Sequence, residues 1–134
     1  MVNDPIADLL IRIKNGGIAR KKEIRAPYSR IREAILKVLA EAGFIAGFQI
    51  QDQNEGKKKE LVIKLKYDAD LNHTIKGVKR VSTPGCRIYI RSSEIKKSIR
   101  GENRLGIIST SRGVLSHCQA LAQNLGGELI AIVW

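Results

Sequence analysis

The segment Ser109-Thr110-Ser111-Arg112-Gly113 holds the densest group of side chains that could do chemistry: three short hydroxyls beside a guanidinium. Such hydroxyls can hydrogen-bond to the 2′-hydroxyls and base edges in the shallow minor groove of folded RNA, while Arg112 can contact a phosphate. We expect a strand-to-helix junction here, where backbone N–H groups of the first helical turn add donors. We interpret the segment as the centre of an RNA-binding surface. The alternative is simple helix capping by Ser111.

A second candidate surface lies on the strand that alternation predicts for residues 86–91. Arg87, Tyr89 and Arg91 share one face of this strand, and apolar side chains occupy the other. An aromatic ring between two guanidiniums suits base stacking combined with phosphate contact. An edge strand kept soluble by its charges explains the same pattern, and both interpretations stay open.

Enzymatic chemistry is not supported by the spacing of these residues. The hydroxyl segment is neither a nucleophile elbow nor a phosphate-binding nucleotide loop. His117 and Cys118 are adjacent, which puts their side chains on different parts of a helix and does not suit a base and nucleophile pair. Cys86 and Cys118 form no C-x-x-C motif and are interpreted as small core side chains. We therefore expect no enzyme, metal, cofactor or disulfide. Any role of His73, His117, Cys86 or Cys118 beyond packing stays open.

The charge balance indicates a polyanionic partner. The 134 residues carry 24 Lys and Arg against 13 Asp and Glu, a formal charge of +11. Residues 71–134 hold 10 basic and 3 acidic side chains, whereas residues 1–70 hold 14 and 10, so the second half should dominate the attraction. Lys57-Lys58-Lys59 could also contact phosphate, although a solvated charged turn is the alternative.

Membrane insertion and export are not expected. No stretch approaches the roughly 20 apolar residues of a membrane-spanning helix, and the N-terminus lacks the order of a signal peptide. The chain is 43% hydrophobic, enough to bury a core. We therefore expect a cytosolic protein.

Hydrophobic periodicity in the first half predicts the order helix, strand, helix, strand, strand. Asp4 should cap a helix that has Pro5 at its first position and ends at Asn15-Gly16-Gly17. A strand follows at residues 23–27, and Ser29 should cap a second helix that Gly43 ends. Residues 44–66 alternate as a hairpin with a turn at Asn54-Glu55-Gly56.

The second half predicts a mostly β domain with one main helix. The polar stretch 67–74 suggests a boundary, giving domains 1–70 and 71–134. We expect strands around 75–81, 86–91, 105–110 and 128–134, with one helical turn and a loop in residues 92–106. The apolar stripe from Val114 to Leu125 predicts the main helix, stopped by Gly126-Gly127. The expected fold class is α+β, with two small, tightly associated α/β domains.

Four segments resemble the bacterial small-subunit ribosomal protein eight family, and the resemblance is highly specific. They are residues 4–15, 79–89, and 106–113 followed by 126–134. The resemblance covers essentially the whole chain. It implies two joined α/β domains, direct and primary binding to the central domain of small-subunit ribosomal RNA, and help in the assembly of that domain. It also implies that residues 109–111 dock near the minor groove of an irregular RNA helix. Arg112 stands where the family usually has Lys, and Ile11 where Thr is frequent.

Several positions are accordingly predicted to bind RNA. They are Asp4, Arg12, Asn15, Lys58, Arg87, Tyr89, Arg91, Ser109, Thr110, Ser111, Arg112, Gly113 and Glu128. The expected partners are the central domain of the ribosomal RNA and neighbouring small-subunit proteins, for a protein that is monomeric when free and works on cytoplasmic ribosomes. A translational repressor that binds its own operon mRNA is the nearest alternative. A small hydrolase and a duplex DNA binder are further ones.

Overall fold

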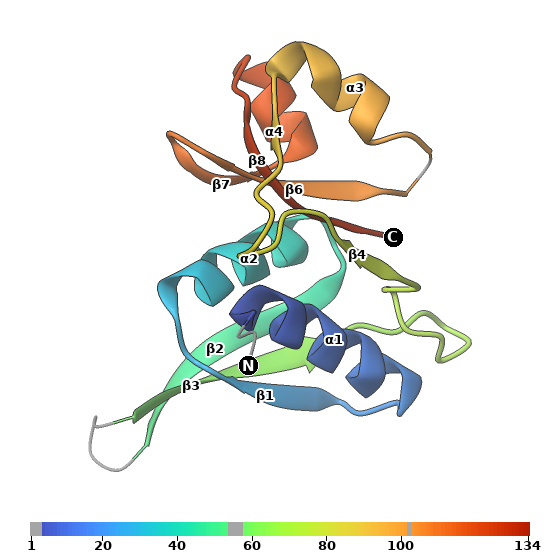
Figure 1. The fold of residues 1–134 in the computed structure, drawn as a ribbon. Coiled ribbons are helices and arrows are strands. Elements are labelled where there is room, and N and C mark those ends of the chain that lie inside the picture. The colour runs from blue at the N-terminus through green and yellow to red at the C-terminus, as the bar shows by residue number, and fades with distance from the viewer. Residues whose placement is uncertain (1–3, 54–57, 102) are drawn as a thin grey trace. The chain divides into compact units, whose positions relative to one another are not determined.

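The computed structural model describes residues 4–53, 58–101 and 103–134, and these form a mixed α+β fold, which confirms the expected class (Figure 1). The chain divides into two compact units, one of Pro5–Lys76 and one that combines Asp4 with Gly77–Trp134. The turn predicted at residues 54–56 lies outside the described residues, as does Lys57. Among the described helices, none is long and apolar enough to cross a membrane.

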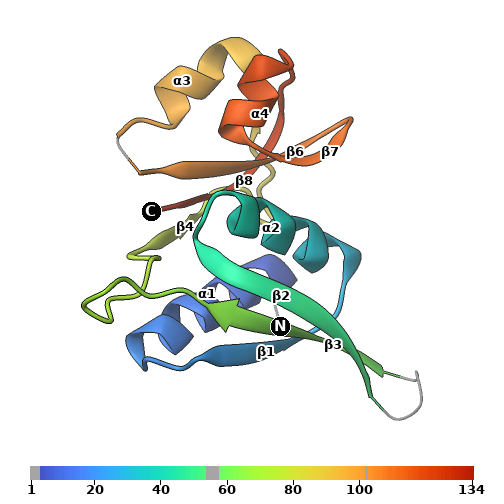
Figure 2. The ribbon, with the colours of Figure 1, turned by 180° about the vertical axis from the view of Figure 1, so that it is seen from behind.

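The unit Pro5–Lys76 has the predicted element order. It contains α1 (Pro5–Ile18), β1 (Glu23–Pro27), α2 (Arg30–Glu41), β2 (Ile45–Gln53) and β3 (Lys58–Leu65). The strands pair antiparallel in the order β1-β3-β2 (Figure 2), with α1 packed on β1 and β3 and α2 packed on β2. The core between helices and sheet consists mainly of aliphatic side chains, including Leu9, Leu10, Ile13, Ile35, Leu36, Leu39, Leu61 and Ile63.

Both helices of this unit begin where the sequence predicts. Pro5 is the first residue of α1, and the Ser29 hydroxyl accepts a hydrogen bond from the Arg32 N–H at 3.2 Å at the start of α2. The helix α1 ends at Ile18, directly after the predicted end at Asn15-Gly16-Gly17. A Cβ at Gly16 would lie 2.6 Å from Ile24 Cγ2, so this glycine also permits close packing against β1.

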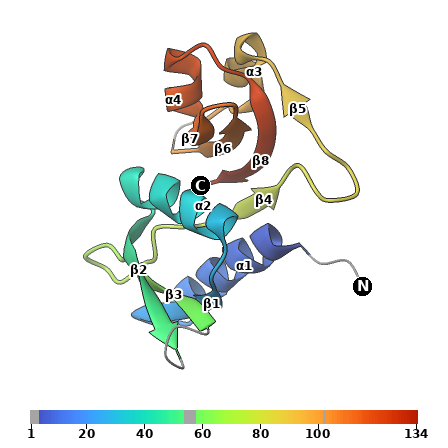
Figure 3. The same ribbon diagram turned by 90° about the vertical axis from the view of Figure 1, so that its left-hand side faces the viewer.

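The unit of Asp4 and Gly77–Trp134 is built on a second antiparallel sheet (Figure 3). Its elements are β4 (Val78–Arg80), β5 (Tyr89–Ile90), η1 (Ser92–Glu94), α3 (Ile95–Ser98), β6 (Leu105–Thr110), β7 (Gly113–Ser116), α4 (His117–Ala122) and β8 (Gly127–Val133). The strand order is β4-β8-β6-β7, and β5 also pairs with β8. Its core joins aliphatic side chains of the helices and strands: Ile90, Ile95, Ile99, Ile108, Ala120, Leu129 and Ile132.

The main helix of this unit is shorter than predicted at both ends. Val114 and Leu115 belong to β7, which pairs with β6, and α4 begins only at His117. The helix ends at Ala122, followed by Asn124 with φ of 55°, before Gly126-Gly127 is reached. Apolar residues at 114 and 115 fit a half-buried strand as well as a helix, so periodicity alone does not distinguish the two.

The strand predicted for residues 86–91 contains only Tyr89 and Ile90. Cys86 lies instead in a turn, where its N–H donates to the Thr83 carbonyl at 3.0 Å. Cys86 is therefore exposed, and so is Cys118 on the outer side of α4. The interpretation of both cysteines as core side chains is wrong, because the buried position of α4 is taken by Ala120.

Candidate nucleic-acid interface

The hydroxyl segment 109–113 forms the turn of the β6–β7 hairpin. Thr110 pairs with Gly113 across the hairpin, which leaves Ser111 and Arg112 exposed at its tip. The Thr110 hydroxyl accepts from the Arg112 N–H at 3.1 Å and donates to the Gly113 carbonyl at 2.8 Å. Gly113 has φ of 105°, which favours glycine. Thr110 and Gly113 therefore shape the turn that presents Ser111 and Arg112.

The predicted strand-to-helix junction at this segment is wrong, and so is the capping role of Ser111. Gly113 reverses the chain into β7, so the backbone N–H groups of a helix start are not at this site. The cap of α4 is Ser116, whose hydroxyl accepts from the Gln119 N–H at 3.2 Å. Because Ser116 performs the capping, capping no longer explains the hydroxyl of Ser111.

The registers of three strand pairs align candidate residues across the sheet. Tyr89 of β5 is opposite Glu128 of β8, Glu128 is opposite Ser109 of β6, and Ser109 is opposite Val114 of β7. Directly opposed residues of antiparallel strands project from the same face. Tyr89, Glu128 and Ser109 therefore form one row on a single face, which we call the sheet row.

Glu128 is the charged residue of the sheet row. Its carboxylate accepts hydrogen bonds from the Ser82 hydroxyl and from Arg87 Nη1, the latter at 3.0 Å. Burial acts to raise the pKa of Glu128, but the bonds from Ser82 and Arg87 outweigh it, so the pKa lies below the ordinary value. Glu128 is therefore a fixed anion that orients Arg87.

Ser82 supports the candidate site through Glu128, and the sequence alone does not single it out. It is completely buried, and its hydroxyl both donates to Glu128 and accepts from the Ile88 N–H at 3.1 Å. Ser82 thus connects the turn before β5 to β8. Nothing in the local sequence distinguishes this serine from an exposed one, because its partner lies 46 residues away.

The aromatic and basic residues beside the sheet row are exposed. The Tyr89 side chain is 69% exposed, although it belongs to a sheet strand. Arg87 and Arg91 flank it two residues away on either side, and both are exposed. The Arg112 guanidinium at the hairpin tip also donates to Gln123 Oε1 at 3.4 Å. An exposed ring can stack on a base while exposed arginines of the same unit contact phosphates.

Gly127 determines how closely β6 and β8 approach beside the sheet row. A Cβ at Gly127 would lie 2.1 Å from the Ser109 carbonyl oxygen and 2.9 Å from its carbon. These are backbone atoms, which cannot turn away as a flexible side chain could. The glycine pair 126–127 was predicted to end a helix, but Gly127 instead permits the close packing of β6 and β8.

Asp4 comes directly before α1 and contacts Arg80 of β4. Its carboxylate binds Arg80 through both oxygens, with Oδ2 3.0 Å from Nε and Oδ1 3.4 Å from Nη2. The Asp4 side chain is only 14% exposed and the Arg80 side chain 13%. Arg80 Nη1 also donates to the Ile130 carbonyl of β8 at 2.6 Å. Asp4 thus fixes β4 against β8 through Arg80.

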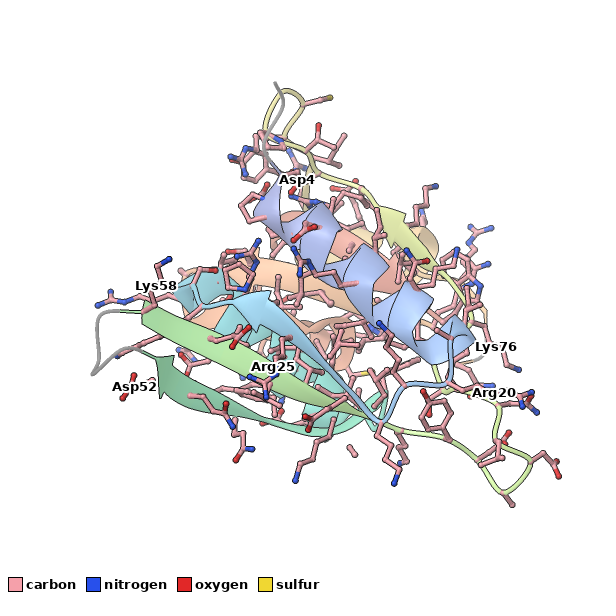
Figure 4. All side chains as sticks on the ribbon, turned by 90° about the horizontal axis from the view of Figure 1, so that it is seen from below. Asp4, Arg20, Arg25, Asp52, Lys58 and Lys76 are labelled. Carbon is pink, nitrogen blue, oxygen red and sulfur yellow. The ribbon has the colours of Figure 1, made fainter. Side chains whose placement is uncertain are left out.

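The remaining predicted positions lie in the unit Pro5–Lys76. Arg12 and Asn15 of α1 line a hollow of about 410 Å³ together with Lys21 and Arg25. Arg12 is held there by Asp8 at 2.9 Å and by the Arg25 carbonyl at 3.2 Å. Lys58 is exposed at the start of β3, at the opposite end of the sheet from Arg20 (Figure 4). Arg12 and Asn15 share a site, and Lys58 does not belong to it.

His117 and Cys118 lie closer together than the sequence analysis expected. His117 Nε2 is 3.5 Å from Cys118 Sγ, because the Gly106 N–H donates to His117 Nδ1 at 2.9 Å and turns the ring. Burial lowers the pKa of His117. Among the described residues, no group of three or more His, Cys, Asp or Glu could hold a metal ion.

Comparison with known proteins gives one consistent family. Residues 4–134 match the family model described as Ribosomal protein S8. The chain is 45% identical to the small ribosomal subunit protein uS8 of Sorangium cellulosum over 134 residues, covering 100% of both chains. It is 41% identical to the protein of that name from Dehalococcoides mccartyi, again with 100% of both covered. For that of Roseiflexus castenholzii the identity is 45%, with 99% of this chain and 98% of the relative covered.

Proposed function

Because this chain belongs to the ribosomal protein S8 family, we propose that it is a structural, non-enzymatic component of the small ribosomal subunit that binds the central domain of its RNA directly. The observation that carries the proposal is the sheet row, in which the exposed Tyr89, Glu128 and Ser109 share one face and Glu128 orients Arg87. The β6–β7 tip adds a hydroxyl and a guanidinium. Together these groups supply stacking, hydrogen bonding and phosphate contact.

The groups at this surface make different kinds of contact with RNA. Tyr89 stacks on an unpaired base, and the hydroxyls of Ser109 and Ser111 hydrogen-bond to 2′-hydroxyls or base edges. Arg91 and Arg112 contact phosphates, which gives affinity but little selectivity. Selectivity for an RNA shape therefore comes from the sheet row and the hairpin tip, and attraction comes from the positive charge around them.

Glu128 has a role that differs from that of the basic residues. A carboxylate repels phosphate, but it accepts hydrogen bonds from a base amino group or a 2′-hydroxyl. Glu128 keeps Arg87 in one orientation through the 3.0 Å contact, so the guanidinium is positioned before RNA arrives. The pair lowers the binding affinity for RNAs that place a phosphate at Glu128 and favours those that place a donor there.

The unit Pro5–Lys76 contributes a second set of RNA contacts in this proposal. Arg12 and Asn15 offer a guanidinium and an amide in one hollow, beside the cations Lys21 and Arg25. Lys58 supplies a separate, exposed cation. These residues add salt-sensitive attraction. Asp4 supports binding indirectly, because both oxygens of its carboxylate contact Arg80.

The decisive experiment is equilibrium binding to a transcript of the central domain, with an unrelated structured RNA as competitor. The measurement is made at low and at physiological salt. We expect binding to the transcript to weaken with salt but to resist the competitor, because hydrogen bonds and stacking are less sensitive to salt than phosphate contacts are. Binding that disappears equally for both RNAs at the higher salt would overturn the proposal.

Two further features of the proposed role follow from the same surface. The protein works on cytoplasmic ribosomes beside other small-subunit proteins. An operon transcript that folds into the shape of the ribosomal site would occupy the same sheet row, so repression of its own mRNA would need no additional surface. Competition between that transcript and the central domain for the protein tests this point, because independent binding of both RNAs would exclude a shared surface.

A further inference from the structure

The unit Pro5–Lys76 has a groove of about 380 Å³ beside the last turn of α1 that RNA binding does not explain. One side is formed by Ile18 and Arg20, and the other by Leu71, Asn72 and Lys76. Its floor is the contact between Gly17 and His73, where a Cβ on the glycine would lie 2.3 Å from the imidazole Nδ1. We call this site the α1-end groove.

The loop that forms one side of the α1-end groove is fixed in place. Asp68 Oδ1 accepts from the N–H groups of Asp70 and Asn72, each at 2.9 Å, and the Asp68 N–H donates to the Asn72 carbonyl at 2.9 Å. The neighbouring Tyr67 hydroxyl donates to the Lys21 carbonyl, which connects the loop to the chain beyond α1. The groove therefore exists before any partner binds.

The groove exposes two large aliphatic side chains. Ile18 is 62% exposed and Leu71 is 60% exposed. Leu71 also has φ of 64°, a left-handed conformation that is strained for a bulky residue. Asn or Gly would form this turn with less strain, so the turn itself does not require leucine. A side chain that is both strained and exposed is better explained by a contact with another molecule.

The charges of the groove define the chemistry of that molecule. Arg20 and Lys76 line the groove on its two sides, and Figure 4 shows both beside the end of α1. An RNA partner would gain neither stacking nor hydrogen bonds from Ile18 and Leu71. A second copy of this chain would bring another +11 charge and the same cations. A protein segment with an apolar side chain next to a carboxylate complements both features.

We propose that the α1-end groove binds a segment of a neighbouring small-subunit protein. The segment inserts an aliphatic or aromatic side chain between Ile18 and Leu71 and places an Asp or Glu against Arg20 and Lys76. This inference rests on the proposed function, since it assumes that the chain is part of a small subunit. Beyond the proposed function, the inference names the surface that contacts a neighbouring protein and the chemistry of the bound segment.

The test places a photo-crosslinking phenylalanine derivative at position 71 of the full chain, incorporated into purified small subunits. We expect a crosslink to a ribosomal protein peptide in which an apolar residue adjoins Asp or Glu. A crosslink to RNA, to a second copy of the chain or to a peptide without an acidic residue would overturn the inference. A second probe at position 89 is expected to crosslink to RNA, so an active probe at 89 with a silent probe at 71 also counts against it.

Charge-reversal variants then test whether the protein crosslink depends on the cations of the groove or only on the net charge of the chain. With the probe at position 71, Arg20→Glu or Lys76→Glu should each lower the protein crosslink roughly fivefold, which corresponds to about 1 kcal/mol for one exposed ion pair. Lys64→Glu is the matched control, because Lys64 is exposed on β3 and does not line the groove. Equal losses in all three variants would show that only the net charge matters and would refute the groove. Failure of RNA crosslinking at position 89 alone would instead refute the proposed RNA surface.

Discussion

The sheet row and the α1-end groove present side chains to solvent by opposite means. In the sheet row, Glu128 is held by side-chain hydrogen bonds from Ser82 and Arg87, so donors and acceptors have fixed directions. In the groove, a backbone turn holds Leu71 and the end of α1 holds Ile18, and the presented surface is aliphatic with cations at its sides. Directed polar groups suit the many hydroxyls and base edges of RNA, whereas preformed apolar surface suits a protein side chain.

The largest expected effect comes from breaking the backbone contact beneath the sheet row. Gly127→Ala would place a Cβ 2.1 Å from the Ser109 carbonyl oxygen, so β6 and β8 must separate. We expect the free energy of unfolding to fall by about 3 kcal/mol, at the upper end for overpacking. Denaturant unfolding measures this change. Gly85→Ala is the control, because a Cβ there meets no atom within 4 Å, and a similar loss in both variants would contradict the packing argument.

Removing the exposed ring should have the next largest effect, on RNA affinity and not on stability. Tyr89→Ala should weaken binding to the central-domain transcript roughly tenfold to a hundredfold, since one stacked base contributes about 1–3 kcal/mol. Tyr89→Phe should keep most of the affinity. Leu71→Asn, which retains a left-handed turn, should leave RNA affinity unchanged. If Leu71→Asn weakened RNA binding as much as Tyr89→Ala, the distinction between the two surfaces would fail.

The hydroxyls of the hairpin should contribute smaller, selective effects. Replacing Ser109 and Ser111 together with Ala should weaken binding to the cognate RNA by roughly tenfold or more, at about 1 kcal/mol for each hydrogen bond. Binding to random duplex RNA should change much less, because Arg112 and the surrounding charge remain. Gel-shift titrations with both RNAs make the comparison. Equal losses on the two RNAs would remove the hydroxyls from recognition.

The smallest expected effect is the pH dependence contributed by Glu128. Its pKa in the folded protein lies below the ordinary value of 4.5, so the stabilisation is present above that value and is lost as the pH falls through the folded pKa. Wild-type protein should therefore lose more stability than Glu128→Gln between neutral pH and pH of about 3. Thermal unfolding at several pH values measures this difference. Parallel curves for the two proteins would mean that the bonds from Ser82 and Arg87 do not stabilise the charged form.

Local signals predicted those elements whose causes are local. Ser29 caps α2 and the strand 105–110 appears at its predicted bounds, because capping and alternation depend on a few consecutive residues. Glycines with a distant contact are harder to interpret from the sequence. Gly127 packs on Ser109, a residue far away in the sequence, and for that reason it resembles a helix end although α4 ends at Ala122.

The candidate RNA surface could be predicted in its residue types but not in its geometry. Arg87, Tyr89 and Ser109 were identified from their chemistry, and register brings Tyr89 and Ser109 to either side of Glu128. Strand register depends on pairing between distant segments, which a single sequence does not encode in any short pattern. For the same reason Ser82, which supports Glu128 from 46 residues away, could not be singled out.

The pairing of Asp4 with Arg80 also bears on the timing of synthesis. The two residues are 76 positions apart, and Arg80 in turn bonds the carbonyl of Ile130, a further 50 positions on. At about 5–20 residues per second, Asp4 leaves the synthesising ribosome several seconds before both partners are available. The unit that carries the sheet row can therefore close only after β8 has been synthesised. A chain that terminates before β8 would lack the surface that we propose for RNA.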